Sequence, residues 1–146
     1  MDMVQKTILI NVPVSAVWDT LTLSPFVQQW TYDTPIQIKT DWKVGSTIVT
    51  SGDLHGIPFR NSGIILAFDP NVKFSYTFLS SLSNLADTDE NHCLLEFDLS
   101  YENKQTRLDL FISNFPDDVI RKHLELYWGP TLELIKEQTE SRHRQT

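Results

Sequence analysis

Apolar and polar residues alternate along much of the chain, which is the pattern of β-strands that bury one face. The alternation predicts strands at 4–12, 36–38, 74–78, 93–101 and 106–112, and a hairpin of two further strands at 47–52 and 59–68. Turn-forming residues at 53–56, 69–71 and 102–104 separate consecutive strands. We therefore expect a sheet of about seven strands, joined mainly as antiparallel neighbours.

Two short segments behind the first strand follow a helical period instead. Apolar residues at 14–21 recur at i, i+3, i+4 and i+7 behind Pro13, and proline suits the first turn of a helix. A second short helix is predicted at 24–30, where Ser24-Pro25 restarts the chain.

The last segment, 117–140, carries a broad apolar stripe and predicts one long helix. We expect Asn114 or a neighbour to cap it, Pro116 to lie in its first turn, and Pro130 to kink it by removing a backbone hydrogen bond. A curved sheet has two faces, and this helix can cover only one of them. The pattern therefore predicts an α+β fold in which the sheet wraps around the helix and the short helices close one end.

Charge and composition exclude several classes of function. The 146 residues include 12 Lys and Arg against 19 Asp and Glu, a formal net charge of −7, which disfavours binding to nucleic acid or an anionic membrane. Neither a signal peptide nor an apolar run long enough for membrane insertion is evident. The single cysteine, Cys93, allows no internal disulfide and indicates a reducing compartment. We expect a single cytoplasmic domain over residues 1–146.

A series of residues in fixed order resembles a known family. The series is Pro13, Val17, Trp18, Leu21, Trp30, Gly45, Gly63-Ile64-Ile65, Phe68-Asp69-Pro70, Tyr127-Trp128-Gly129, Leu132 and Leu134-Ile135-Lys136. Over residues 4–139 the chain resembles the family named after the activator of heat-shock protein 90 ATPase, in its C-terminal-domain-like branch. That family belongs to the START-like, birch-pollen-allergen-like (SRPBCC) superfamily. The resemblance implies a helix-grip fold with a hydrophobic cavity between sheet and long helix, but no single activity.

Catalytic and cofactor motifs are absent from the sequence. The five glycines fit no phosphate-binding fingerprint, no nucleophile elbow exists, and the four histidines lack metal-ligand spacing. We therefore expect no cofactor, no metal and no catalytic residue. Glu96 and Asp98 share one strand face, which we expect to face solvent and to pair with Arg107 across a hairpin. Cys93 is expected to be a buried, inert thiol.

The candidate ligand-binding residues are those predicted to face the cavity. Tyr76 is the polar member of an aromatic strand face, and Arg60, with His55 and Asn61, is predicted near the mouth of a hairpin, although the phase of Arg60 is ambiguous. The segment 79–91 is long for a hairpin loop and is either a lid or a loop packed outside. The candidates are Trp30, Tyr32, Arg60, Phe74, Tyr76, Phe78, Leu124 and Trp128.

Three functions remain open. The preferred one is a non-enzymatic module that binds a small apolar molecule, with core packing as the alternative role of its aromatic residues. The second is an enzyme of the cyclase or hydratase type, which would need a titratable group in the cavity. The third is a stress-related module with a chaperone as partner. The resembling co-chaperones carry a separate chaperone-binding domain that 146 residues leave no room for.

Overall fold

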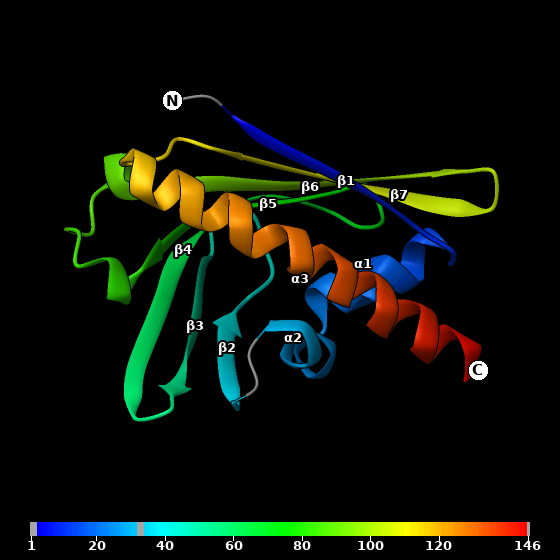
Figure 1. Cartoon of the computed structure of the whole chain (residues 1–146), viewed down its shortest axis with the longest axis horizontal. Coiled ribbons are helices and arrows are strands. Elements are labelled where there is room, and N and C mark those ends of the chain that lie inside the picture. Colours follow the sequence, from blue (N-terminus) through cyan, green and yellow to red (C-terminus); the bar gives the residue numbers. More distant parts are fainter. Residues whose placement is uncertain (1–2, 32–33, 146) are drawn as a thin grey trace.

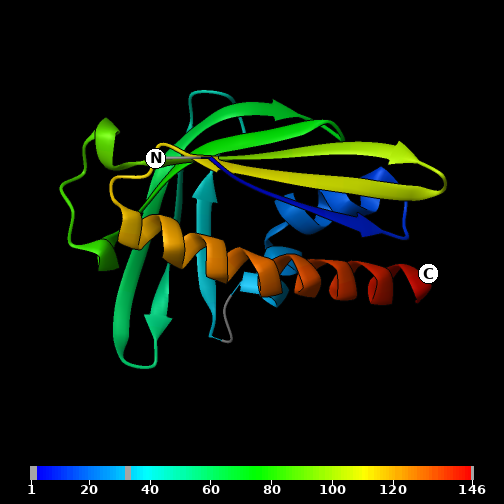
Figure 2. The same ribbon diagram turned by 45° about the horizontal axis from the view of Figure 1, so that its top comes forward.

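The computed structural model describes residues 3–31 and 34–145 and shows a curved antiparallel sheet with one long helix running along its inner side (Figures 1 and 2). The strands are β1 (Val4–Ile10), β2 (Ile36–Thr40), β3 (Thr47–Leu54), β4 (Ile57–Asp69), β5 (Lys73–Ser80), β6 (Cys93–Glu102) and β7 (Gln105–Ser113). The helices are α1 (Val14–Thr22), α2 (Ser24–Thr31) and α3 (Asp118–Arg144), with short 3₁₀ turns η1 (Ser81–Ser83) and η2 (Asp89–Asn91). The predicted helix-grip arrangement is confirmed.

The seven strands lie in the order β1-β7-β6-β5-β4-β3-β2, so β1 and β2 are the two edges. Two hairpins close with two-residue turns. His55 and Gly56 join β3 to β4 with φ of 54° and 96°, and Asn103 and Lys104 join β6 to β7 with φ of 56° and 64°. Positive φ at both turn positions matches the twist of paired strands, which explains these tight connections.

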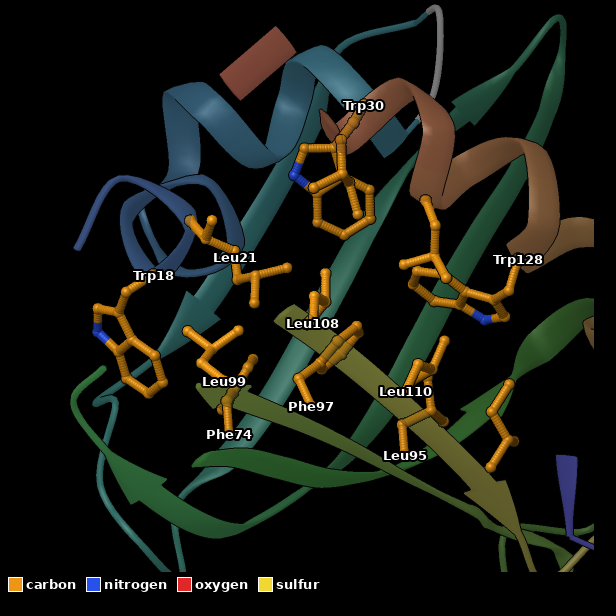
Figure 3. Close-up of a cluster of buried hydrophobic side chains, with 14 of the residues drawn as sticks. Trp18, Leu21, Trp30, Phe74, Leu95, Phe97, Leu99, Leu108, Leu110 and Trp128 are labelled. Carbon is orange, nitrogen blue, oxygen red and sulfur yellow. The ribbon is translucent and has the colours of Figure 1, made fainter. Parts of the chain in front are cut away.

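Alternate residues of each strand face the helices and form the core (Figure 3). The inward residues at 93–99 of β6 and 106–112 of β7 are at most 7% exposed, and they pack beneath side chains from all three helices. Aromatic rings connect the layers: Trp18 of α1 packs edge-on against Phe68 and Phe74, with centroids 5.2 and 6.3 Å away. The inward faces of the strands and the apolar faces of the helices therefore meet in one core rich in aromatic residues.

The long helix differs from the sequence expectation at its start. Asp117, not Asn114, is the N-cap, and its Oδ1 accepts a hydrogen bond of 2.8 Å from the backbone N–H of Ile120. Pro116 therefore precedes the cap. Asn114 has φ of 58° and its Nδ2 donates to the carbonyl of His92, so it holds a turn between β7 and the helix.

The helix also continues through Pro130 and ends at Arg144. Proline has no N–H and cannot donate the hydrogen bond to the carbonyl four residues earlier, yet the helix does not end at this position. The hydroxyl of the next residue, Thr131, donates to the carbonyl of Tyr127 at 2.7 Å. In Figure 1, α3 is drawn as one continuous helix.

The C-terminal half of the long helix fixes the two short helices. The hydroxyls of Thr20 and Thr139 are hydrogen-bonded at 2.8 Å inside the core. Arg142 donates to the same Thr20 hydroxyl and its guanidinium lies 3.7 Å over the ring of Phe26. The indole N–H of Trp30 donates to the carbonyl of Thr20 at 2.8 Å. The position of Trp30 is therefore set by both short helices and by α3.

Glu96 and Asp98 lie on the outer face of the sheet, as expected, but the basic residue that pairs with them is not the expected Arg107. Lys73 lies 3.6 Å from Glu96 and 4.0 Å from Asp98, whereas Arg107 pairs with Asp109 at 3.1 Å. The strand register explains this, since Lys73 lies directly opposite Asp98 and Arg107 lies opposite a serine. Burial, together with a hydrogen bond that protonated Asp98 donates to the carboxylate of Glu96, raises the pKa of Asp98 to about 6.

Candidate functional site

The inner face of the sheet is closed at one end and partly open at the other. Beneath α3, the inward residues at 93–99 of β6 and 106–112 of β7 are buried. Toward the other edge, the inward residues of β2 and β3, together with Tyr76 and Phe78 of β5, are only half-buried although they face the helices. We call this region the open strip; it consists of Ile36, Ile38, Ile48, Thr50, Tyr76 and Phe78.

The difference arises from how the long helix crosses the sheet. α3 packs most closely on the edge strand β1, and in Figure 1 β2, β3 and β4 diverge from its axis. A helix about 10 Å wide covers only part of a seven-stranded face. The strands farthest from β1 therefore keep inward side chains that solvent still reaches.

A polar row crosses the inner face beside these apolar residues. Thr50 of β3 lies directly opposite Asn61 of β4, and Asn61 lies opposite Ser80 of β5. Asn61 is 8% exposed and Thr50 is half-buried. The Ser80 hydroxyl already accepts a hydrogen bond from the backbone N–H of Leu82. Hydroxyl and amide groups of neighbouring strands thus lie side by side, with no charge among them.

Aromatic residues of the helices bound the open strip. Trp30 and Trp128 have ring centroids 6.0 Å apart, and Trp128 packs edge-on against Phe97 at 5.6 Å (Figure 3). Tyr127, on the next position of α3, is half-buried and perpendicular to the Trp128 ring. These rings separate the closed core from the half-buried end of the face.

The structure places the sequence candidates in three environments. Trp30, Phe74, Leu124 and Trp128 are 3–7% exposed and belong to the packed core. Tyr76 and Phe78 lie on the predicted inward face and form part of the open strip. Tyr76 also contacts Phe74, with ring centroids 5.1 Å apart and the rings tilted by 37°. Tyr32 lies outside the described residues, so its candidate role stays a prediction.

Arg60 lies on the opposite face from the other candidates. It is exposed, and its neighbours Phe59 and Asn61 are the inward residues of β4. Arg60 lines a shallow hollow of about 450 Å³ on the outer surface with Lys39 and Ser51. It therefore does not orient a ligand on the inner face. A second hollow, of about 320 Å³, lies beside Lys6 and Gly129, and neither hollow includes a residue of the open strip.

The segment 81–92 connects β5 to β6 and contains both 3₁₀ turns. Its first turn packs against β4, and the backbone N–H of Arg60 donates to the Ser81 hydroxyl at 2.9 Å. Leu79 is buried, while Leu82 is 47% exposed. In both views the segment lies near the N-terminal end of α3 (Figures 1 and 2). Its role as a lid stays a prediction.

Charged groups are almost absent from the inner face of the sheet. Among the described strand residues that share the inward face, Lys6 of β1 is the single charged one. It lies at the β1 edge, where its Nζ is 3.8 Å from the position of a β-carbon on Gly129. Cys93 is inward and 2% exposed, and burial raises the pKa of its thiol to about 11. A protonated thiol is a poor nucleophile.

The described part of the chain gathers no group of three or more histidine, cysteine or acidic side chains that could hold a metal ion. Within residues 3–31 and 34–145, no helix is both long and apolar enough to cross a membrane.

Comparison with known proteins places this fold in a family. The model of the family described as activator of Hsp90 ATPase homolog 1-like protein matches residues 11–140. The chain belongs to this family. The family resemblance of the sequence is thereby confirmed. No curated protein matches the chain.

Solved structures share the fold over almost the whole chain. ChR145 from Cytophaga hutchinsonii has a TM-score of 0.82 at 26% identity, covering 99% of this chain and 97% of that one. The Aha1 dimer from Colwellia psychrerythraea has a TM-score of 0.75 at 19% identity, covering 96% and 97%. DynU16, a putative protein in the dynemicin biosynthetic locus, has a TM-score of 0.74 at 17% identity, covering 96% and 48%. The last two show the fold alone.

Sequence reasoning missed the polar row and the division of the inner face. The sequence pattern predicts Asn61 only near the mouth of the hairpin. Its spacing from Phe59 and Ile65 has the strand period of two and could have placed it inward. Nothing in the local pattern could have found its neighbour Thr50, because cross-strand register depends on the hairpin that joins β3 to β4.

Proposed function

We propose that this member of the family binds a small, largely apolar molecule against the open strip. The observation that carries the proposal is that apolar and aromatic side chains facing the helices stay half-buried there, while the inward residues at 93–99 of β6 and 106–112 of β7 are buried. Ligand sites favour such concave, aromatic-lined positions on a rigid sheet.

Burial of apolar surface would supply the binding free energy. Each 100 Å² of apolar surface removed from water is worth about 2.5 kcal/mol. Tyr76 and Phe78 add aromatic contacts on the sheet side, and Tyr127 adds one from the helix side. A modest ligand could therefore bind by covering the open strip, provided that its own ordering costs stay small.

The enzymatic alternative needs an acid or base beside the ligand. In the described strands the inner face carries no carboxylate and no imidazole, and the thiol of Cys93 is held protonated. This chemistry favours binding over proton transfer. The chaperone alternative would use the outer surface instead, so blocking the open strip would leave it intact.

Native mass spectrometry of protein purified from its own cells tests the proposal. We expect an added mass that disappears in Thr50→Phe, which fills the open strip. Thr47→Phe is the matched control, because Thr47 lies on the same strand with its side chain on the outer face. A bare mass in every preparation, or equal loss in both variants, would contradict ligand binding at the open strip.

A further inference from the structure

A hollow of about 450 Å³ on the outer face of the sheet forms a second candidate binding surface. We call it the outer hollow; its lining includes Lys39, Asp41, Thr47, Ser51 and Arg60. We propose that the outer hollow binds a phosphate monoester whose organic part carries hydroxyl groups. The site is independent of the proposed function, because Lys39, Ser51 and Arg60 lie on the opposite face of β2, β3 and β4 from the open strip.

The strand register sets the order of these groups along the outer hollow. Arg60 of β4 lies directly opposite Ser51 of β3. The register partner of Lys39 on β3 comes two residues before Ser51. Thr47, at the start of β3, is two residues farther on, and Asp41 follows the end of β2 beside it. These groups therefore span about 13 Å of β3, at about 3.3 Å per residue, from a cationic end to an end with an acid and a hydroxyl.

The two basic side chains of the outer hollow are not neutralised by neighbouring acids. Lys39 and Arg60 are exposed, and within the described part of the chain neither forms an ion pair. By contrast, Lys73, Arg107 and Lys136 lie 3.6, 3.1 and 2.7 Å from carboxylates. β2 and β4 are about 10 Å apart across β3, so two long side chains can reach one bound group from both sides. Their charge is therefore available to a bound anion, although the chain as a whole carries −7.

A phosphate group matches the cationic end better than a carboxylate does. The guanidinium of Arg60 can bind two oxygens of an anion at once, and the ammonium of Lys39 adds a point charge. The Ser51 hydroxyl, directly beside Arg60, can donate to a third oxygen. A phosphate monoester has three terminal oxygens and close to two negative charges above pH 7. Asp53, the next outward residue of β3, is hydrogen-bonded to the backbone N–H of Gly56 in the hairpin turn.

The other end of the outer hollow selects the organic part of the ligand. The Asp41 carboxylate repels a second phosphate but accepts hydrogen bonds from neutral hydroxyl groups. Thr47 is exposed at the same end and offers a hydroxyl of its own. A sugar phosphate, with its phosphate between Lys39 and Arg60 and its hydroxyls toward Asp41, satisfies both ends. A ligand with phosphates at both ends does not.

Chemical-shift titration of the isotope-labelled full chain at pH 8 tests the proposal. The three probes are inorganic phosphate, ribose 5-phosphate and ribose. We expect saturable shifts of the backbone amides at 39–41, 47–51 and 60 with both phosphates. Ribose 5-phosphate should bind about tenfold more tightly than inorganic phosphate, and ribose alone should give no saturable shift.

Two variants assign the binding to the cationic end. Arg60→Gln and Lys39→Gln each remove one charge and keep a long polar side chain, and both positions are exposed, so the fold should be unaffected. Each should weaken the binding of ribose 5-phosphate by about tenfold. Lys122→Gln is the matched control, because it removes the same charge from the exposed surface of α3. It should change the affinity by less than about twofold, since salt screens distant charges.

A third variant, Asp41→Asn, tests the hydroxyl end. Removal of the negative charge acts on both phosphate probes alike, so the informative quantity is the ratio of their affinities. The preference for ribose 5-phosphate over inorganic phosphate should fall by about three- to tenfold, because the carboxylate no longer accepts hydrogen bonds from the ribose hydroxyls.

The outcomes separate the two parts of the proposal. Absence of saturable shifts with both phosphates, or equal weakening by Lys122→Gln and Arg60→Gln, would overturn a phosphate site in the outer hollow. If ribose 5-phosphate bound no more tightly than inorganic phosphate, or if Asp41→Asn left their ratio unchanged, the hydroxyl-bearing ester would be wrong as the ligand class.

Discussion

The indole rings of Trp30 and Trp128 lie 6.0 Å apart, which joins the second short helix to the middle of the long one. Trp30 is fixed by its hydrogen bond to the carbonyl of Thr20, and Trp128 rests edge-on against Phe97 of the sheet. This contact closes the core next to the open strip. Both tryptophans therefore belong to the packed core beside the open strip, and neither exposes much surface.

Truncation of Trp128 should cost stability. Because its side chain is 5% exposed and packed between Trp30 and Phe97, Trp128→Ala should lower the free energy of unfolding by about 3–5 kcal/mol. Urea unfolding followed by circular dichroism measures this. Leu126→Ala is the control, since Leu126 is 77% exposed on the same helix and should change little. An unchanged stability of Trp128→Ala with altered ligand uptake would instead make Trp128 a wall of the binding site.

Stability should depend on pH through Asp98. Its pKa is raised from 3.8 to about 6 by burial and by Glu96, so the folded protein keeps a proton that the unfolded chain has already released. Stability from this group is therefore complete below pH 3.8 and is lost as the pH rises through about 6. Asp98→Asn should raise the free energy of unfolding by about 1 kcal/mol at pH 7, after allowance for solvent exposure, and not at pH 3.5. An equal change in the free energy of unfolding at both pH values would rule out this explanation.

Two glycine substitutions should have opposite effects. A β-carbon on Gly63 would lie 1.7 Å from the carbonyl oxygen of Thr77, so Gly63→Ala must displace backbone and should destabilise strongly. A β-carbon on Gly129 would meet only the Lys6 ammonium at 3.8 Å, and alanine is the better helix former. Gly129→Ala should therefore stabilise by up to about 1 kcal/mol. Thermal unfolding of both variants measures these changes. A melting temperature that rises in both variants, or falls in both, would contradict the prediction.

The Cys93 thiol should resist modification in the folded protein. Burial, reinforced by the negative charge of Asp117, raises its pKa to about 11, so little thiolate forms at pH 8. Ellman's reagent should react slowly with the native chain and fully once guanidinium unfolds it. Rapid reaction under native conditions would show that the strand opens locally.

Most of the fold was predictable because its elements have one buried face. The alternation at 93–101 and 106–112 placed the inward residues of β6 and β7 correctly, since a period of two leaves one choice of core face. The three helices were predictable for the same reason, since their apolar residues recur with the helical period on one buried face. The capping residue did not, because Asn114 and Asp117 are equally good caps and only the path of the chain after β7 selects one.

The site was harder to predict because β4 is apolar on both faces. Ile64 and Leu66 face outward while Ile65 faces inward. Because both faces carry apolar residues, the sequence pattern does not show on which face Arg60 lies. A register shift between Ile65 and Ala67 then changes the phase along the same strand. Similarly, the pairing of Lys73 with Asp98 depends on how β5 meets β6 across a long connection, which no local pattern specifies.

The position of β1 at the edge of the sheet has a consequence for the order of folding. β1 is the first strand made, yet its partner in the sheet is β7, so Val4 pairs with Ile112. The hairpins in the middle of the sheet close over short loops and should form early, whereas this pairing must wait for nearly the whole chain. α3 packs most closely on β1 and is made last of all. The first and last elements should therefore dock together in the final step, which seals the closed half of the inner face.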